Sequence, residues 1–248
     1  PVDRERAVRA ASAAADVAWS VRDRVNDWGS PSMPPHEWIR YYANRWVDVA
    51  SESWLKDHPG AWDSCEGEWV HDPANPFVLA VDMALKHDSV AVNRVEELPD
   101  GRFAVTTKVW KANQRGQIDH EQVWNYIVEE ARGPQFRGVA YDPRFFEVPA
   151  RILHERGILA IQFDQSPQRM APACGLTYER ILNSTIVHNG DPELTDAVKS
   201  AVQMPQERGG FTLRKNKSKR HIDACIAMCI GVWVLSEVPE VEEVPNLW

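Results

Sequence analysis

The chain has 248 residues, 44% of them hydrophobic and 26% charged, a composition that can form a hydrophobic core and argues against disorder over most of its length. Acidic residues outnumber basic ones 36 to 28, and the net charge of −8 excludes a protein that coats nucleic acid by overall charge alone. No apolar run is long enough to span a membrane, and the N-terminus lacks a signal-peptide pattern. These features predict a cytoplasmic protein, and the 4 scattered cysteines predict reduced thiols.

The first third of the chain differs from the rest because it is rich in tryptophan: seven of the 11 tryptophans lie before residue 75. Residues 3–27 are rich in Ala and Arg and predict a helix. A second helix is predicted over residues 36–55, where large apolar residues recur at helical spacing: Trp38, Tyr42, Trp46 and Val49. This stripe favours packing against a neighbouring domain over a ligand site.

From residue 77 the pattern becomes strand-like. Residues 77–81 form a continuous apolar run typical of a central strand, and residues 89–95 and 103–110 alternate like the next two strands. The later elements follow in chain order: a helix over 119–131, a strand over 136–141, a helix over 145–156, a strand over 158–163, helices over 167–182 and 192–203, a short strand over 211–213 and a helix over 220–235. This order predicts a mixed sheet in which three antiparallel strands are followed by parallel crossovers.

Two apolar strand runs end in an aspartate, Asp82 and Asp142. If the strands are neighbours, a spacing of about 4.8 Å brings the carboxylates close enough to repel, and a divalent cation would relieve the repulsion. Asp223 is the third candidate, because it opens the last predicted helix, where the helix dipole tolerates an anion. Converging carboxylates suit Mg²⁺, and two such ions roughly 3.5–4 Å apart can hydrolyse a phosphodiester. Taken singly, each aspartate is more typical of a capping or salt-bridged residue, so the prediction depends on their convergence.

The densest basic segment of the chain lies immediately before Asp223. Between residues 208 and 220 there are several basic residues and no acidic one: Arg208, Arg214, Lys215, Lys217, Lys219 and Arg220. This is the local patch that DNA binding would need in an acidic protein. Lys219 would share a helix face with Asp223 if the helix began early. The alternative is a solvated loop whose charges only aid solubility.

Two further groups of residues allow competing interpretations. His221, Cys225 and Cys229 recur every four residues and could suggest a zinc site, but a fourth ligand at plausible spacing is missing, which favours core thiols. His188 and Asp88 are candidates to contact the carboxylates without binding the metal themselves. Alternatively they are simple turn residues, and this second interpretation is favoured.

Together these motifs resemble the nuclease domain of the large terminase subunit of tailed bacteriophages. The resemblance covers about residues 35–236, and it is carried by five short segments: Trp38–Val47, Val81–Ala84 with Asp88-Ser89, Tyr141–Arg144, Val187–Pro192 and Lys219–Ala224. It implies an α/β fold, with an RNase H-like mixed five-stranded sheet flanked by helices and an N-terminal helical extension. The domains expected are a helical Trp-rich connector over 1–75, the nuclease over 76–236 and an acidic tail over 237–248.

The resemblance also implies a function, a Mg²⁺- or Mn²⁺-dependent endonuclease that cuts concatemeric double-stranded viral DNA during genome packaging. Asp82 would bridge two ions, Asp142 would hold one and Asp223 the other. Lys219 would steady the scissile phosphate or the attacking water. DNA contacts are expected from the basic segment: Arg214, Lys215, Lys217, Lys219 and Arg220. The implied partners are double-stranded DNA, the terminase ATPase domain, the small terminase subunit and the portal protein, in the host-cell cytoplasm and without a membrane.

The chain departs from the family in one respect, because it contains no Gly-Lys dipeptide and therefore no phosphate-binding loop of an ATPase motor. It also begins at Pro1 without methionine, which predicts an excised domain or processed fragment. Two other interpretations stay open. One is a related RNase H-like nuclease acting on branched DNA or RNA–DNA hybrids. The other is a non-catalytic docking module that positions DNA while the connector and tail bind the packaging motor.

Overall fold

The computed structural model describes residues 21, 24–26, 42, 53–83, 89–113, 118–206, 209–215 and 221–237, with the backbone only for residues 145–149. The chain divides into two units, Pro1–Glu52 and Ser53–Trp248. Most of the two N-terminal helices predicted over 3–27 and 36–55 lies outside the described residues. The elements described below belong to the second unit.

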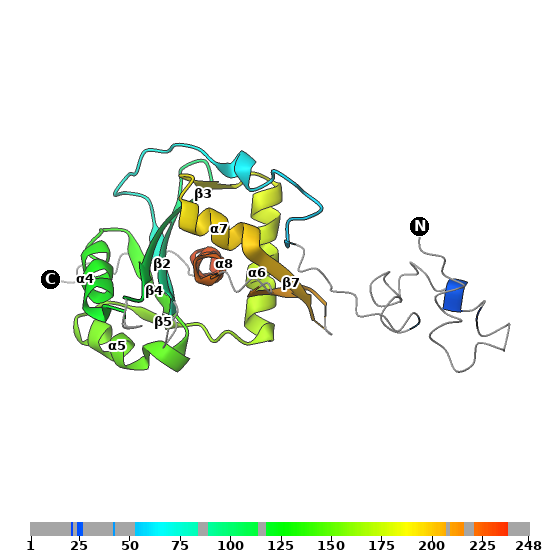
Figure 1. The fold of residues 1–248 in the computed structure, drawn as a ribbon. Coiled ribbons are helices and arrows are strands. Elements are labelled where there is room, and N and C mark those ends of the chain that lie inside the picture. Colours follow the sequence, from blue (N-terminus) through cyan, green and yellow to red (C-terminus); the bar gives the residue numbers. More distant parts are fainter. Residues whose placement is uncertain are drawn as a thin grey trace. The chain divides into compact units, whose positions relative to one another are not determined.

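A six-stranded mixed sheet forms the centre of this unit (Figure 1), in the strand order β5-β4-β1-β2-β3-β6. Its strands are β1 (Phe77–Met83), β2 (Ser89–Glu97), β3 (Phe103–Lys111), β4 (Phe136–Tyr141), β5 (Ala160–Gln162) and β6 (Ile186–His188). β2 is antiparallel to β1 and to β3, whereas the pairs β1–β4, β4–β5 and β3–β6 are parallel. All strands except β2 therefore end at one edge of the sheet, and β2 begins there.

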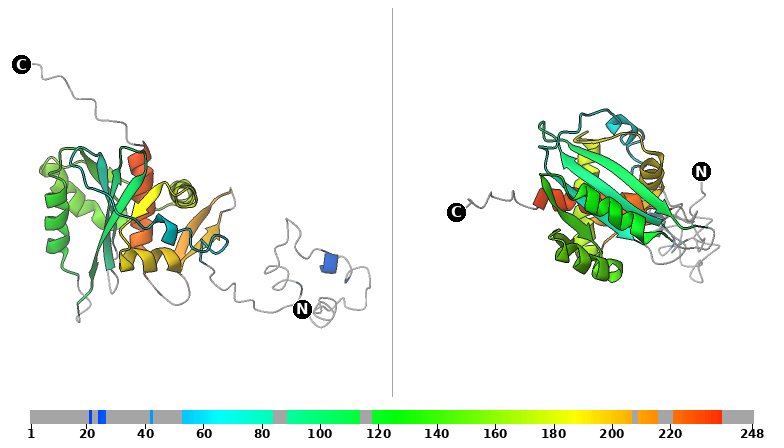
Figure 2. Two further views of the ribbon diagram at one scale, coloured as in Figure 1. Left: turned by 90° about the horizontal axis from the view of Figure 1, so that it is seen from above. Right: turned by 90° about the vertical axis from the view of Figure 1, so that its left-hand side faces the viewer.

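Helices cover both faces of the sheet (Figure 2). One face carries α4 (His120–Glu130) and α5 (Pro143–Glu155), and the other carries α6 (Pro167–Leu182), α7 (Pro192–Ser200) and α8 (Asp223–Glu237). Smaller elements complete the unit: η1 (Asp63–Cys65) and a hairpin of β7 (Ala201–Pro205) and β8 (Phe211–Lys215). Helix starts follow local sequence signals, since the Asp119 and Asp191 side chains accept backbone N–H groups of the first turn of α4 and α7.

Helix α8 lies between the sheet and helices α6 and α7 (Figure 1). Nearly every residue of this helix is buried. A Cβ atom at Gly231 would lie 2.6 Å from Val95 Cγ2 and 3.1 Å from Ala80 Cβ, so the glycine allows the helix backbone to approach β1 and β2 closely. The position of the first turn of α8 is thus determined by tight packing along the rest of the helix.

The predicted mixed α/β sheet is present, but the predicted number of five strands is wrong. The sixth strand, β6, pairs with β3 as an outer strand of the sheet. It has only three residues, too few to produce a recognisable alternation. The helix predicted to reach residue 203 ends at Ser200, because the following residues pair with β8. Most other predicted elements agree with the structure within a few residues.

The predicted domain boundaries at residues 75 and 236 stay predictions. Trp54 and Trp62 are each 2% exposed and belong to the same core cluster as α8, so the segment before β1 packs on this unit. The acidic tail beyond Glu237 lies outside the described residues. In the part of the chain that the structure describes, no helix is both long enough and apolar enough to cross a membrane.

Candidate active site

Asp82 and Asp142 lie on neighbouring strands at the edge where most strands end. Val81 pairs with Tyr141 in the parallel register of β1 and β4, and each is followed directly by one of the aspartates. Side chains alternate along a strand, so Asp82 shares the face of Ala80, which is the face covered by α8. Asp142 is 7% exposed and forms the N-cap of α5. The topology therefore brings together the two carboxylates that the sequence pattern singled out.

Asp223 reaches the same edge from the first residue of α8. The hydroxyl of Ser89, the first residue of β2, donates a hydrogen bond to Asp223 Oδ2 at 2.5 Å. The Asn93 side chain, farther along β2, donates from Nδ2 to the carbonyl oxygen of Ala224 at 2.8 Å. Both donors are almost fully buried, and so is Asp223, which is 6% exposed. Strand β2 thus ties the start of α8 to the sheet edge.

The electrostatics of Asp82 show that the three carboxylates converge. Burial, followed by repulsion from Asp223 and, to a smaller extent, from Asp142, raises the pKa of Asp82 from 3.8 to about 7. A hydrogen bond from Gln165 and the charge of Lys215 act in the opposite direction. Near neutral pH, both the protonated and the charged form of Asp82 are therefore populated, and an added cation would favour the charged form.

Each of the three carboxylates has one oxygen in a hydrogen bond. Gln165 Nε2 donates to Asp82 Oδ1 at 2.8 Å, and the backbone N–H of Arg144 donates to Asp142 Oδ1 at 2.9 Å. Lys215 Nζ lies 3.6 Å from Asp223 Oδ1. Because an ionised carboxylate offers about four acceptor sites, these bonds leave capacity for a further ligand.

The donor set fits a divalent cation of the Mg²⁺ type, which prefers carboxylate oxygens and keeps several waters. Bringing such an ion among the three carboxylates would relieve the repulsion that perturbs Asp82. In their present orientations, no three His, Cys, Asp or Glu side chains of the described ranges could hold a metal ion. Binding would therefore require a rearrangement of the carboxylates around the ion, and their remaining acceptor sites allow this without loss of the hydrogen bonds from Gln165 and Arg144.

The basic segment is described only in part. Arg214 and Lys215 are exposed residues of β8, and Lys215 faces Asp223. Three further predicted DNA-binding residues and the candidate Asp88 lie outside the described residues: Lys217, Lys219 and Arg220. Since α8 begins at Asp223, Lys219 precedes the helix, and the condition for a shared helix face is not met. The roles of these residues in DNA binding and catalysis stay predictions.

His188 has partners other than the carboxylates. Its ring stacks on Trp62 with centroids 3.8 Å apart and an interplanar angle of 1°. Nδ1 accepts the Gly190 N–H at 3.1 Å, so Nε2 carries the proton and donates to the Trp62 carbonyl oxygen at 3.0 Å. Burial lowers the pKa of His188 and favours this neutral form. His188 thus joins β6 to the segment before β1.

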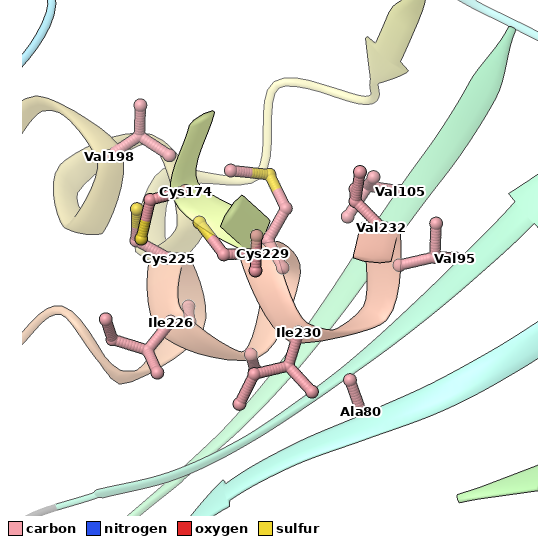
Figure 3. Close-up of a cluster of buried hydrophobic side chains, with 14 of the residues drawn as sticks. Ala80, Val95, Val105, Cys174, Val198, Cys225, Ile226, Cys229, Ile230 and Val232 are labelled. Carbon is pink, nitrogen blue, oxygen red and sulfur yellow. The ribbon is translucent and has the colours of Figure 1, made fainter. Parts of the chain in front are cut away.

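The cysteines of α8 are core residues. Cys225 and Cys229 are both 0% exposed, and Figure 3 shows their sulfur atoms close to that of Cys174, which comes from α6. A hydrogen bond to Cys229 and burial raise the pKa of Cys174 well above its usual range, and the pKa of Cys229 is raised as well. All three are free thiols buried in the core, as the sequence interpretation favoured. His221 instead points its Nδ1 toward Asp223 Oδ2, 3.6 Å away.

Sequence reasoning missed two residues that contact the carboxylates of this site, Gln165 and Ser89. Both contact a carboxylate through a neutral donor and lie far from it in the sequence. The sequence signal is position: Gln165 lies shortly after β5, which ends at Gln162, and Asp142 directly follows β4. That signal could have placed Gln165 near the edge, but not its contact with Asp82.

Comparisons with known proteins identify the family of the chain. Residues 82–238, more than half of the chain, match the family model described as "Terminase large subunit, endonuclease domain". No curated protein matches the chain.

Among solved structures, the large terminase of bacteriophage HK97 is similar at 20% identity and a TM-score of 0.67, covering 94% of this chain and 55% of that one. The large terminase of a thermophilic bacteriophage, solved in complex with ADP, is similar at 16% identity and a TM-score of 0.57, with 90% and 53% covered. The large terminase nuclease of thermophilic phage G20c with bound magnesium is similar at 12% identity and a TM-score of 0.52, with 66% and 83% covered. The chain thus spans about half the length of the HK97 protein and of the ADP-bound terminase. These matches confirm the predicted RNase H-like fold, and with the family model they establish that the chain belongs to the endonuclease domains of terminase large subunits.

Proposed function

We propose that this chain is a Mg²⁺- or Mn²⁺-dependent endonuclease that cleaves concatemeric double-stranded viral DNA during genome packaging. The observation that carries the proposal is the convergence of Asp82, Asp142 and Asp223 at one sheet edge, where mutual repulsion contributes to the raised pKa of Asp82. Divalent cations are the natural partners of such a group. The similar G20c nuclease was solved with bound magnesium, which supports this choice of ion.

In this proposal Asp82, Asp142 and Asp223 would hold two ions, with Asp82 shared between them, Asp142 serving one and Asp223 the other. The chemistry that such ions would supply at these residues is the activation of a water for attack on the phosphodiester and stabilisation of the leaving oxygen. Asp82 must lose its proton to act as a ligand, and a pKa of about 7 allows this near neutral pH. Ser89 and Gln165 orient two of the carboxylates through their hydrogen bonds.

The same proposal assigns DNA binding to the basic segment that leads to Asp223. Arg214 and Lys215 in β8 would contact backbone phosphates together with Lys217 and Arg220, while Lys219 would steady the scissile phosphate or the attacking water. The terminase ATPase domain is a proposed partner, because the HK97 and ADP-bound matches are large terminases about twice as long as the segment matched here. The small terminase subunit and the portal protein are further proposed partners, in the host cytoplasm during assembly.

Plasmid cleavage in the presence of Mn²⁺ tests this function. Wild-type protein should convert supercoiled plasmid to linear DNA, and Asp82→Ala should lose this activity. Asp57→Ala is a matched control, since Asp57 is an exposed aspartate of the same unit, and it should cut like the wild type. Undiminished cutting by Asp82→Ala would refute the assignment.

The two open alternatives are tested by substrate choice and by metal binding. Faster cleavage of a four-way junction or an RNA–DNA hybrid than of linear duplex would favour a related RNase H-like nuclease. A wild-type protein without saturable Mn²⁺ binding in calorimetry, but with tight binding to another component of the packaging motor, would favour the docking module.

A further inference from the structure

Gln165 is the side chain that contacts Asp82 from the segment joining β5 to α6. Its Nε2 donates a hydrogen bond to Asp82 Oδ1 at 2.8 Å, across 83 positions of the chain. An ionised carboxylate can only accept hydrogen bonds, so the NH₂ end of the amide must face Asp82. The amide group of Gln165 therefore has a defined orientation toward the Asp82 carboxylate.

The turn that carries Gln165 is held at both ends. The Phe163 N–H donates to the Tyr141 carbonyl oxygen at 2.8 Å, which extends the pairing of β5 with β4. The Asp164 side chain accepts the Ser166 N–H at 2.9 Å, and Pro167 begins α6 directly afterwards. Phe163 is fully buried, with the Arg169 guanidinium 4.6 Å from its ring centroid. The backbone at Gln165 is thus positioned before any ion binds.

The sheet order makes this contact span three strands. β4 lies between β5 and β1, so Gln165 reaches Asp82 across the end of the strand that Asp142 follows. An element that supplies none of the three carboxylates therefore contributes to their arrangement.

We propose that Gln165 is a positioning residue that holds Asp82 in the orientation needed to bind a divalent cation. The inference deepens the proposed function and depends on it. Hydrogen bonds to metal-binding carboxylates fix the direction of their remaining lone pairs. A neutral amide does so without adding positive charge, whereas Lys or Arg at this position would repel the incoming dication. The donor type is therefore suited to a carboxylate that must remain available to a metal.

The test measures Mn²⁺ binding to the whole chain by isothermal calorimetry, without DNA. Gln165→Met keeps the length of the side chain but removes the donor, so it should weaken Mn²⁺ binding by about 10–100-fold, the usual effect of losing a hydrogen bond to a metal ligand. Gln165→Asn keeps the amide on a shorter side chain and should fall between Met and wild type. Gln168→Met is the matched control, because Gln168 is exposed in the first turn of α6, and it should bind like wild type.

Thermal unfolding of each metal-free variant separates positioning from folding. The inference expects Gln165→Met to unfold within a few degrees of wild type while its Mn²⁺ affinity falls. It is overturned if both Gln165 variants bind Mn²⁺ as tightly as wild type, or if their affinity falls only with loss of the cooperative unfolding transition. Wild-type protein that binds no Mn²⁺ would refute the proposed function itself, which distinguishes the two failures.

Discussion

Replacing Asp82 with asparagine should stabilise the metal-free protein while destroying its function. The environment of Asp82 raises its pKa from 3.8 to about 7, so the folded protein pays a free-energy cost whenever this group is ionised. One pKa unit corresponds to ~1.4 kcal/mol, which gives a cost of ~4 kcal/mol at pH values above about 7. The pKa of Asp82 is raised on folding, so below pH 3.8, where the group is protonated in both states, the folded protein keeps its full stability. As the pH rises toward 7, the unfolded chain ionises Asp82 more easily than the folded protein does, and this stability is lost. Asp82→Asn removes this charge, and its amide oxygen can still accept the hydrogen bond from Gln165.

Urea unfolding in the presence of EDTA measures this effect. Asp82→Asn should exceed wild type by ~4 kcal/mol at about pH 8 and by only ~2 kcal/mol at about pH 5, where the folded wild type already keeps the proton. Asp57→Asn, at an exposed position, should change stability by no more than ~0.5 kcal/mol at either pH. A variant that is no more stable than wild type at the higher pH, or equally stabilised at both, would refute the raised pKa of Asp82.

Three further predictions follow from the packing and the pKa directions. Gly231→Ala should cost about 1–3 kcal/mol of unfolding free energy, because its Cβ would lie 2.6 Å from Val95; unchanged stability in urea would contradict this packing. The pKa of His188 is lowered on folding. Its contribution to the free energy of unfolding is therefore fully present above about pH 6.5 and is lost as the pH falls below that value. The stability difference between wild type and His188→Gln should therefore shrink toward pH 5, and a constant difference would count against a neutral His188. Mn²⁺ affinity in calorimetry should fall up to tenfold per pH unit below about 7, as the proton on Asp82 competes with the ion, and a flat profile would exclude that competition.

The local signals in the sequence were sufficient for most elements. Strand β4 (Phe136–Tyr141) and helix α6 (Pro167–Leu182) have the predicted bounds, because a short apolar run and a proline at the helix start are local features. Helix α4 agrees with its predicted range within one residue, and it buries Val123 and Ile127, which lie four residues apart on one face. The exceptions are β6 and β7, short strands that exist only because a partner strand lies beside them. Neither strand has a local pattern that distinguishes it from a loop or from the end of a helix.

The sequence by itself determined which carboxylates to consider. Asp82 and Asp142 could be named because a charge at the end of an apolar strand is costly unless something compensates it, and Asp223 because it opens an apolar helix. The tertiary structure decided that they converge, and that Ser89 and Gln165 hold two of them. The physical reason is that burial and repulsion depend on distances across the sheet, which strand order and the packing of α8 at Gly231 set together. Periodicity along a chain describes one element at a time and contains no such distances.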